Sequence, residues 1–276
     1  MLRKMKLCKV VAILENFAPL KLAGSWDNVG LLVEPSSHTV KKMLLTNDLT
    51  KRVLEEAIET KSDMILSYHP PIFSPLKRLT QSSWKERIVI KCLENKIAVF
   101  SPHTSWDAIE GGVNDWLIKP FDKIIQNCEA VEKIDGIDYS TTSTKVGYGR
   151  RANLNKSIAL KDAIEIVKTH LNMQNVRLAF DNKKTIDDIK INSIGVCAGS
   201  GASVLRYAKA DLLISGEMSH HEVLNYVAGG SSVILCEHSN TERGFLKHIQ
   251  AKLSEQLEDS IEVLVSSTDA DPLQIV

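Results

Sequence analysis

Most histidines of this sequence follow predicted strands, the positions at which α/β proteins bind ligands. Five of the eight histidines come just after predicted strands: His69, His103, His220, His221 and His238. The strands that precede them are predicted at residues 64–68, 97–101, 212–215 and 232–236. In open α/β sheets, ligands gather outside the carboxyl ends of the strands. The positions of the histidines therefore predict a chemical site at these strand ends.

Two of these histidines are followed by a carboxylate four residues later. The pairs are His103 with Asp107 and His238 with Glu242. Residues four apart lie on one face of a helix, so both side chains of a pair can reach one ion. Imidazole and carboxylate ligands suit zinc, iron, manganese or nickel, and the spacing does not choose among these metals. The alternative interpretation of each single pair is a solvated helix start.

Other motifs have structural interpretations beside chemical ones. The prolines after His69 can make a rigid turn, and the segment 26–30 reads as a turn that Asp27 stabilises through the local backbone. The Gly-Ser-Gly run at 199–201 is either a tight turn or a phosphate-binding loop, and it fits no complete phosphate-binding pattern. No nucleophile motif is present, and Cys236 is expected to act as a small buried apolar residue.

Composition excludes several classes of protein. Lys+Arg and Asp+Glu both number 34 in the 276 residues, so no net basic charge supports direct nucleic-acid binding. The five cysteines are scattered and include no C-x-x-C pair, which is typical of a reduced, intracellular protein. No apolar run reaches the roughly 18–20 residues that a membrane helix needs. The basic start at residues 1–7 continues into a predicted helix, so we expect a cytoplasmic protein rather than a mitochondrial one.

The pattern of apolar residues predicts alternating strands and helices. This alternation favours an α/β fold of two similar halves, each with a mostly parallel sheet flanked by helices. The predicted halves are residues 1–120 and 159–276, and the polar segment 121–158 is expected to connect them. The predicted helices are 6–17, 50–61, 84–95, 113–118, 160–171, 202–209, 220–228 and 241–253. Further predicted strands are 43–46, 176–180, 189–197 and 261–265.

Five motifs, in order along nearly the whole chain, resemble the Nif-three-like family. The motifs are Trp26-Asp-Asn-Val-Gly-Leu-Leu32, Tyr68-His-Pro-Pro-Ile-Phe73, His103-Thr-Ser-Trp-Asp107, Gly216-Glu-Met-Ser-His220 and Glu237-His-Ser-Asn-Thr-Glu-Arg-Gly244. The family includes the bacterial YbgI-like proteins and was once described as type-2 GTP cyclohydrolase homologues. The second and fifth motifs are most similar to the eukaryotic branch.

The resemblance implies a di-metal centre in a cleft between the halves and a ring-shaped homohexamer. Carried over by position, His69 and Asp107 would bind the first metal ion, His238 would help to bind the second, and Glu242 would bridge the two. Bacterial members have two adjacent histidines where this chain has Tyr68 and His69. Tyrosine binds most divalent ions poorly unless it is ionised, and its ordinary pKa is about 10. We therefore expect one or two ions per chain.

Two functions from different classes are compatible with these residues. The first is a metal-dependent hydrolase acting on a small or nucleotide-like substrate, with His103, Glu217 or His220 as general base. The second is a cytoplasmic or nuclear adaptor with a structural or vestigial metal site. Eukaryotic family members are described as interacting with transcriptional regulators, so a transcription-regulator partner is expected in that case. No guanine pocket is recognisable, which argues against a GTP cyclohydrolase.

Overall fold

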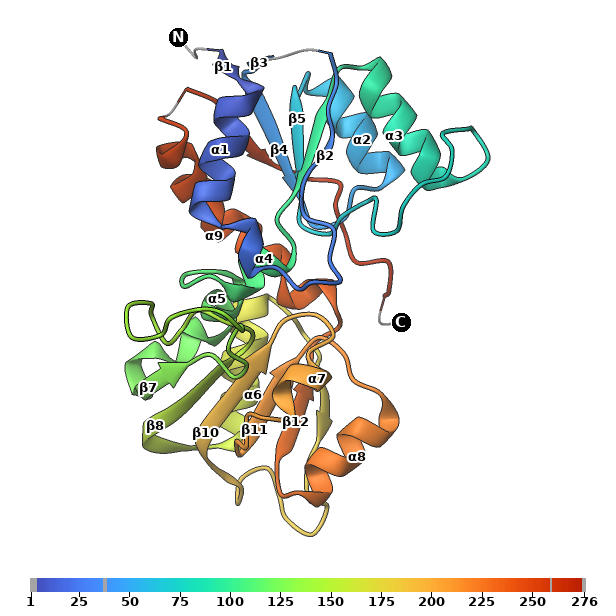
Figure 1. The fold of residues 1–276 in the computed structure, drawn as a ribbon. Helices are drawn as coiled ribbons and strands as arrows, with labels where there is room; N and C mark the ends of the chain where they lie inside the picture. Colours follow the sequence, from blue (N-terminus) through green and yellow to red (C-terminus); the bar gives the residue numbers. More distant parts are fainter. Residues whose placement is uncertain (1–3, 37–38, 259, 275–276) are drawn as a thin grey trace. The chain divides into compact units, whose positions relative to one another are not determined.

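A computed structural model describes residues 4–36, 39–258 and 260–274 of the chain (Figure 1). The chain forms two compact units. The first unit runs to Trp106 and resumes at Leu246, and the second unit runs from Asp107 to Phe245. Each unit contains its own sheet with helices packed against it, which confirms the predicted α/β class. None of the described helices combines the length and apolar character needed to cross a membrane.

The first unit is built on a five-stranded sheet. Its strand order is β13 (Glu262–Val265), β4 (Lys42–Thr46), β5 (Met64–Ser67), β6 (Ala98–Ser101) and β2 (Gly30–Val33). All neighbours are parallel except β2, which runs antiparallel to β6. Strands β4, β5 and β6 are buried throughout except at Lys42, as expected of parallel strands covered on both faces.

Helices cover both faces of this sheet. Helices α2 (Lys51–Glu59) and α3 (Trp84–Glu94) pack on one face, where Leu44, Ile65 and Val99 meet their apolar sides. Figure 1 shows α1 (Leu7–Phe17) and α9 (Arg243–Gln256) on the opposite face. The unit also contains the short pair β1 (Met5–Lys6) and β3 (Thr39–Val40) and the turn η1 (Leu20–Leu22), and α4 (Thr104–Ala108) crosses its boundary.

Hydrogen bonds to Glu56 of α2 hold the C-terminal segment that follows β13. The Glu56 carboxylate accepts hydrogen bonds from the backbone N–H of Ser267 and Thr268 and from the hydroxyls of Ser266, Ser267 and Thr268. The Asp269 carboxylate accepts a further bond from the backbone N–H of Asn47, at 2.7 Å. Side chains therefore hold residues 266–269 beside α2 and the end of β4.

The second unit is built on a six-stranded sheet. Its strand order is β7 (Ile125–Glu129), β8 (Arg150–Ala159), β10 (Lys190–Cys197), β11 (Leu212–Ser215), β12 (Ser232–Leu235) and β9 (Arg177–Ala179). Only the central strands β10, β11 and β12 are parallel to one another, and the other three pairings are antiparallel. This sheet is therefore mixed rather than mostly parallel.

Two helices cover one face of this sheet and a third covers the other. Helices α7 (Ala202–Leu205) and α8 (His220–Ala228) pack over β10, β11 and β12 through an apolar cluster that includes Leu205 and Leu213. Figure 1 shows α6 (Leu160–Leu171) on the opposite face. The remaining helical elements are α5 (Val113–Ile118), η2 (Lys119–Ile124) and η3 (Ser239–Thr241).

A buried arginine organises the start of β8. The Arg150 guanidinium is fully buried and donates two hydrogen bonds to Asp115, at 2.9 and 3.0 Å. It also donates to the backbone carbonyls of Gly147, Gly149 and Ile109. A buried guanidinium is tolerated only when its donors are satisfied in this way.

The units differ from the sequence-based halves in two respects. The segment 121–158, expected to be a connector, contributes β7 and most of β8 to the six-stranded sheet. Residues 246–276, expected to belong to the second half, return to the first unit because β13 pairs with β4. Backbone pairing between distant segments thus sets the units, and the local pattern of apolar residues does not encode it.

Candidate functional site

Site residues of the first unit follow three neighbouring parallel strands. Asp48 comes shortly after β4, His69 after β5 and His103 after β6. The carboxyl ends of parallel strands lie at one edge of a sheet, so the strand order brings these side chains to that edge. The rings of His69 and His103 are 5.4 Å apart.

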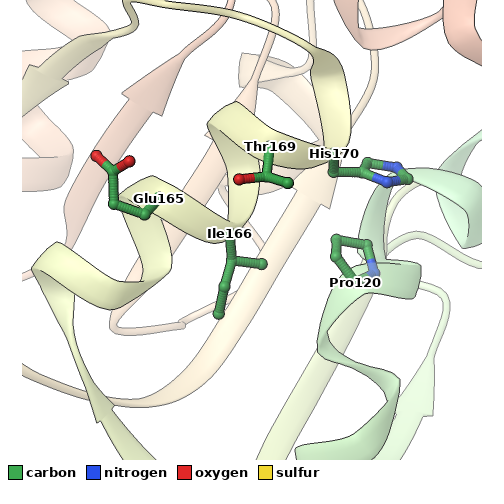
Figure 2. Close-up of a pocket in the computed structure, with 5 residues that line it drawn as sticks. All are labelled: Pro120, Glu165, Ile166, Thr169 and His170. Atoms are coloured by element: carbon green, nitrogen blue, oxygen red, sulfur yellow. The ribbon is translucent and has the colours of Figure 1, made fainter.

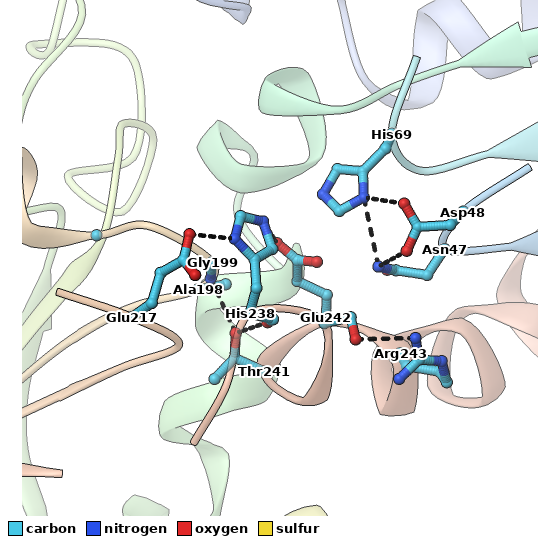
Figure 3. A network of polar contacts seen from close by, with 12 residues as sticks. Asn47, Asp48, His69, Ala198, Gly199, Glu217, His238, Thr241, Glu242 and Arg243 are labelled. Carbon is cyan, nitrogen blue, oxygen red and sulfur yellow. Dashed lines mark hydrogen bonds and ion pairs between the residues drawn. The ribbon is translucent and has the colours of Figure 1, made fainter. Parts of the chain in front are cut away.

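The imidazole of His69 is oriented by Asp48. Its Nδ1 lies 2.9 Å from Asp48 Oδ1, whereas the Asn47 amide nitrogen is at 3.5 Å (Figure 3). The shorter contact is a hydrogen bond to a carboxylate, which can only accept, so Nδ1 carries the proton. The lone pair of the neutral ring is then on Nε2, the atom that can bind a metal ion. A carboxylate behind a histidine in this manner is typical of metal-binding histidines.

His103 is oriented in the same way by Asp27. Its Nδ1 lies 2.8 Å from Asp27 Oδ1, and Asp27 Oδ2 accepts hydrogen bonds from the backbone and hydroxyl of Thr104. Burial alone would raise the pKa of Asp27, but the interactions with His103 and Thr104 outweigh it and hold the pKa below its ordinary value. The segment 26–30 is therefore more than a local turn. The backbone φ of His103 is +33°, a strained conformation that recurs at functional sites.

Tyr68 is a packed residue of the first unit. It is 1% exposed, and its ring contacts those of His69, His103 and Trp106, with centroids 5.3 to 6.3 Å apart. Its backbone carbonyl accepts hydrogen bonds from Ser101 and from the N–H of His103. The tyrosine ring therefore supports both histidines through edge-on packing.

Site residues of the second unit also follow its three parallel strands. Gly199 comes after β10, Glu217 after β11 and His238 after β12. His238 Nδ1 lies 2.9 Å from Glu217 Oε1, and its Nε2 lies 3.4 Å from Glu242 Oε1 (Figure 3). The Glu242 side chain is 4% exposed, whereas that of Glu217 is 50% exposed. Glu217 thus orients the imidazole, while Nε2 and the buried carboxylate face one another as two atoms that could bind a metal ion.

Gly199 lies directly behind this pair. A Cβ on Gly199 would come within 2.7 Å of Glu242 Oε1 and 2.9 Å of His238 Nε2, and its φ of +62° also favours glycine. The N–H of Gly199 donates to the hydroxyl of Thr241, which donates to the His238 carbonyl. Helix α7 after this loop has only four residues. Close packing against the histidine and the glutamate therefore explains Gly199, and close approach to Cys197 and Ser215 explains Gly201.

Asp107 and His220 are the other two predicted site residues in the second unit. The backbone carbonyl of Asp107 accepts a hydrogen bond from the Asn114 amide, and Asn114 Oδ1 accepts one from the backbone N–H of Ala198, next to Gly199. His220 is the first residue of α8, and it lines a pocket formed with β9 and β12. The structure therefore groups Glu217, His238 and Glu242 and places His220 in a separate pocket.

The cysteine after β12 does not supply a nucleophile. Burial raises the pKa of the Cys236 thiol to about 12, so this sulfur stays protonated at neutral pH. The interpretation of Cys236 as a small apolar residue of the core is in line with this environment.

A further pocket of the second unit lacks the character of a chemical site. It lies between η2 and α6, with a volume of about 440 Å³, and Figure 2 shows its lining by Pro120, Glu165, Ile166, Thr169 and His170. Glu165 forms an ion pair with Lys168, and the His170 ring packs on that of Trp116. These side chains are engaged in local packing of α6.

The metal-binding potential of the described residues rests on the types of their ligand atoms. In the second unit, His238 Nε2 and Glu242 Oε1 offer an imidazole nitrogen and a carboxylate oxygen, and in the first unit His69 offers an imidazole nitrogen; each of these ligand types suits a divalent ion. Sequence reasoning missed Asp48 and assigned only a turn to Asp27. Asp48 could have been predicted as a site residue, because it comes shortly after a predicted buried strand, as the site histidines do.

The sequence is similar to eukaryotic proteins over its whole length. Residues 5–272 match the model of the Duf34/NIF3 family, described as NGG1p interacting factor 3. NIF3-like protein 1 of Drosophila melanogaster is 47% identical over 285 residues, covering 100% of this chain and 93% of the relative. NGG1-interacting factor 3 of Saccharomyces cerevisiae is 39% identical over 285 residues, covering 98% of this chain and 97% of the relative.

Solved structures share the fold. A Bacillus cereus protein related to NIF3 superposes with a TM-score of 0.85 at 20% identity, covering 99% of both chains. Reduced HcgD from Methanocaldococcus jannaschii superposes with a TM-score of 0.79 at 25% identity, covering 97% of this chain and all of that one. These likenesses agree with the resemblance carried by the motifs and with the α/β class predicted from the pattern of apolar residues.

Proposed function

Because the chain belongs to the Duf34/NIF3 family, we propose that it binds divalent metal ions and hydrolyses a small or nucleotide-like substrate with them. The proposed ligands are His69, Asp107, His238 and Glu242. The observation that carries the proposal is the arrangement of His238, whose Nδ1 is held by Glu217 while Nε2 faces the buried Glu242 carboxylate. The ion could be zinc, iron, manganese or nickel, since the ligand types suit all four.

A bound divalent ion would lower the pKa of a water molecule and polarise the bond to be cleaved. Among the three proposed general bases, His103 has the geometry that suits the role best. Asp27 holds its Nδ1, so Nε2 is the atom that would accept a proton. Glu217 is engaged with His238 and is better suited to positioning that ligand. His220 lines a different pocket, which makes it the weakest of the three.

Metal stoichiometry tests the proposal. The chain is stripped of metal, reloaded and measured by elemental mass spectrometry, together with His238→Ala, Asp107→Ala and the control His221→Ala on the exposed side of α8. We expect one or two ions per chain in wild type and the control, and a loss in both site variants. Two ions would mean that a working di-metal centre exists despite Tyr68, and one would mean a single site. No retained ion in wild type would refute metal binding.

Turnover is measured separately, on a panel of nucleotides, phosphoesters and peptides. We expect metal-dependent hydrolysis that His238→Ala abolishes. A loaded protein that turns over no member of the panel would contradict the hydrolase but leave metal binding intact.

A second candidate function is that of an adaptor in which the metal is structural or vestigial. Two observations favour it: Tyr68 is packed among aromatic rings, and the yeast relative is named as an NGG1-interacting factor. In this case a cytoplasmic and nuclear homohexamer would bind a transcriptional regulator. Native mass spectrometry tests the oligomer, and affinity capture with His238→Ala tests whether partner binding survives without metal.

A further inference from the structure

A pocket of the first unit is lined by His69, the residues just before α2, the start of α3 and the C-terminal segment. Its volume is about 480 Å³, within the usual range for small-molecule sites. Most of the lining is apolar, from Leu49, Pro70, Pro71, Ala270 and Pro272. Its polar groups include Asp48, which is engaged with His69, and Lys85. The walls therefore suit the flat apolar face of a ligand, with polar groups at few points.

One wall carries an exposed aromatic ring at an anchored helix start. Trp84 is the first residue of α3, and the residue is 52% exposed. The turn before it is tied down: the Ser83 hydroxyl caps α3, and the Glu86 carboxylate accepts hydrogen bonds from the backbone and hydroxyl of Thr80. An indole on an anchored helix start can stack on a planar ring without losing much conformational freedom.

The neighbouring Lys85 supplies a positive charge. Its Nζ lies 5.6 Å from the centre of the Trp84 ring. Within the described part of the chain, Lys85 forms no ion pair with a carboxylate. Asp48, the acidic residue in the lining, has its Oδ1 on the His69 ring. An unpaired ammonium beside an open aromatic face favours a ligand that joins a planar ring to an anion.

We propose that this pocket binds a planar aromatic group joined to a phosphate, with the ring stacked on Trp84 and the phosphate on Lys85. Because His69 lines the same pocket, the bound molecule is the substrate of the metal site, a step that rests on the proposed function. The proposal thereby names the substrate class as aromatic phosphates, of which nucleotides are the common examples.

Calorimetric titration of metal-stripped protein with AMP, adenosine and inorganic phosphate tests the binding directly. We expect AMP to bind more tightly than either part alone. Trp84→Ala should weaken AMP binding at least about 10-fold, and Trp84→Phe should restore most of it, because a base can stack on either ring. Lys85→Gln should weaken AMP about 5- to 10-fold and leave adenosine unchanged.

The second unit offers matched controls. Tyr207 is 55% exposed, and the Arg206 guanidinium lies 4.8 Å from its ring centre. Tyr207→Ala and Arg206→Gln remove a similar aromatic and cation pair outside the pocket, and both should bind AMP as wild type does. Thermal unfolding checks that every variant is folded.

Two outcomes would overturn the pocket assignment: wild type binds no AMP, or Trp84→Ala binds it as wild type does. The binding is measured without metal, so it is independent of the metal stoichiometry. Aromatic phosphate binding without metal retention would refute the proposed function alone, and metal retention without AMP binding would refute this inference alone.

Discussion

Replacing Glu56 with glutamine is expected to release the C-terminal segment that lines the pocket beside His69. The Glu56 carboxylate accepts five hydrogen bonds from residues 266–268. Glutamine is nearly the same size, but it is uncharged and has one accepting oxygen in place of two. The variant therefore loses the bonds to one oxygen and weakens those to the other.

The lowered pKa of Glu56 sets an upper limit on the stability that Glu56→Gln can lose. Burial alone would raise this pKa, but the hydrogen bonds from Ser266, Ser267 and Thr268 outweigh it and lower the pKa from 4.5 to about 2. At about 1.36 kcal/mol per pKa unit, this difference corresponds to at most about 3 kcal/mol. The carboxylate is partly exposed, so solvent screening reduces the expected loss in Glu56→Gln to about 1–2 kcal/mol.

The pH dependence follows from the sign of that pKa change. A carboxylate with a lowered pKa in the folded state stabilises the protein fully above its ordinary value of 4.5. This contribution is lost as the pH falls from about 4.5 toward about 2. The difference in free energy of unfolding between wild type and Glu56→Gln should therefore be full at pH 7 and shrink below pH 4.5.

Urea unfolding at several pH values and amide hydrogen exchange measure these effects. Exchange should accelerate at Ser267 and Thr268, whose N–H groups bond to Glu56, and at Asn47, whose N–H bonds to Asp269. The control is Glu55→Gln, because Glu55 is the neighbouring exposed carboxylate of α2 and, among the residues that the structure describes, pairs only with Lys51. Unchanged exchange at Ser267 and Thr268 in Glu56→Gln would refute the reasoning.

Three further predictions concern the second unit. Glu217→Gln should weaken metal binding about 10- to 100-fold in a calorimetric titration, because the orienting carboxylate behind His238 is lost; an unchanged affinity would argue against a positioning role. Gly199→Ala should lower the thermal midpoint and the metal affinity together, since its Cβ would lie 2.7 Å from Glu242 Oε1; an alanine variant that binds metal normally would contradict this. Arg150→Met should cost about 3–5 kcal/mol in urea unfolding, because Asp115 is left without its buried partner, and adding Asp115→Asn should recover part of that loss.

Much of the local structure could be predicted from the sequence. The predicted helices 113–118, 160–171 and 220–228 have the same bounds as α5, α6 and α8. Their apolar residues recur at helical spacing, and the signals that begin and end them are local. The same local signals predicted that His69 and His238 follow strands, which placed them at the functional edges of the two sheets.

Other features depended on contacts between distant segments. Strand β8 carries an alternation of buried and less buried residues from Arg150 to Leu154, but the preceding Ser/Thr/Gly-rich stretch suggested a connector. The pairing of β13 with β4 spans most of the chain, and no local pattern reports it. The sequence did not predict that Asp48 orients His69 or that Glu217 orients His238. Each carboxylate meets its histidine only when two neighbouring strands pair in the folded sheet.

The discontinuity of the first unit has a consequence for synthesis on the ribosome. The second unit is one continuous stretch, from Asp107 to Phe245, so all its strands have emerged before the last residues of the first unit are made. Until β13 arrives, the outer edge of β4 has no partner, and such an edge is prone to pairing with other chains. We therefore expect the second unit to fold first. We also expect chaperones to protect the nascent chain while the first unit still lacks β13.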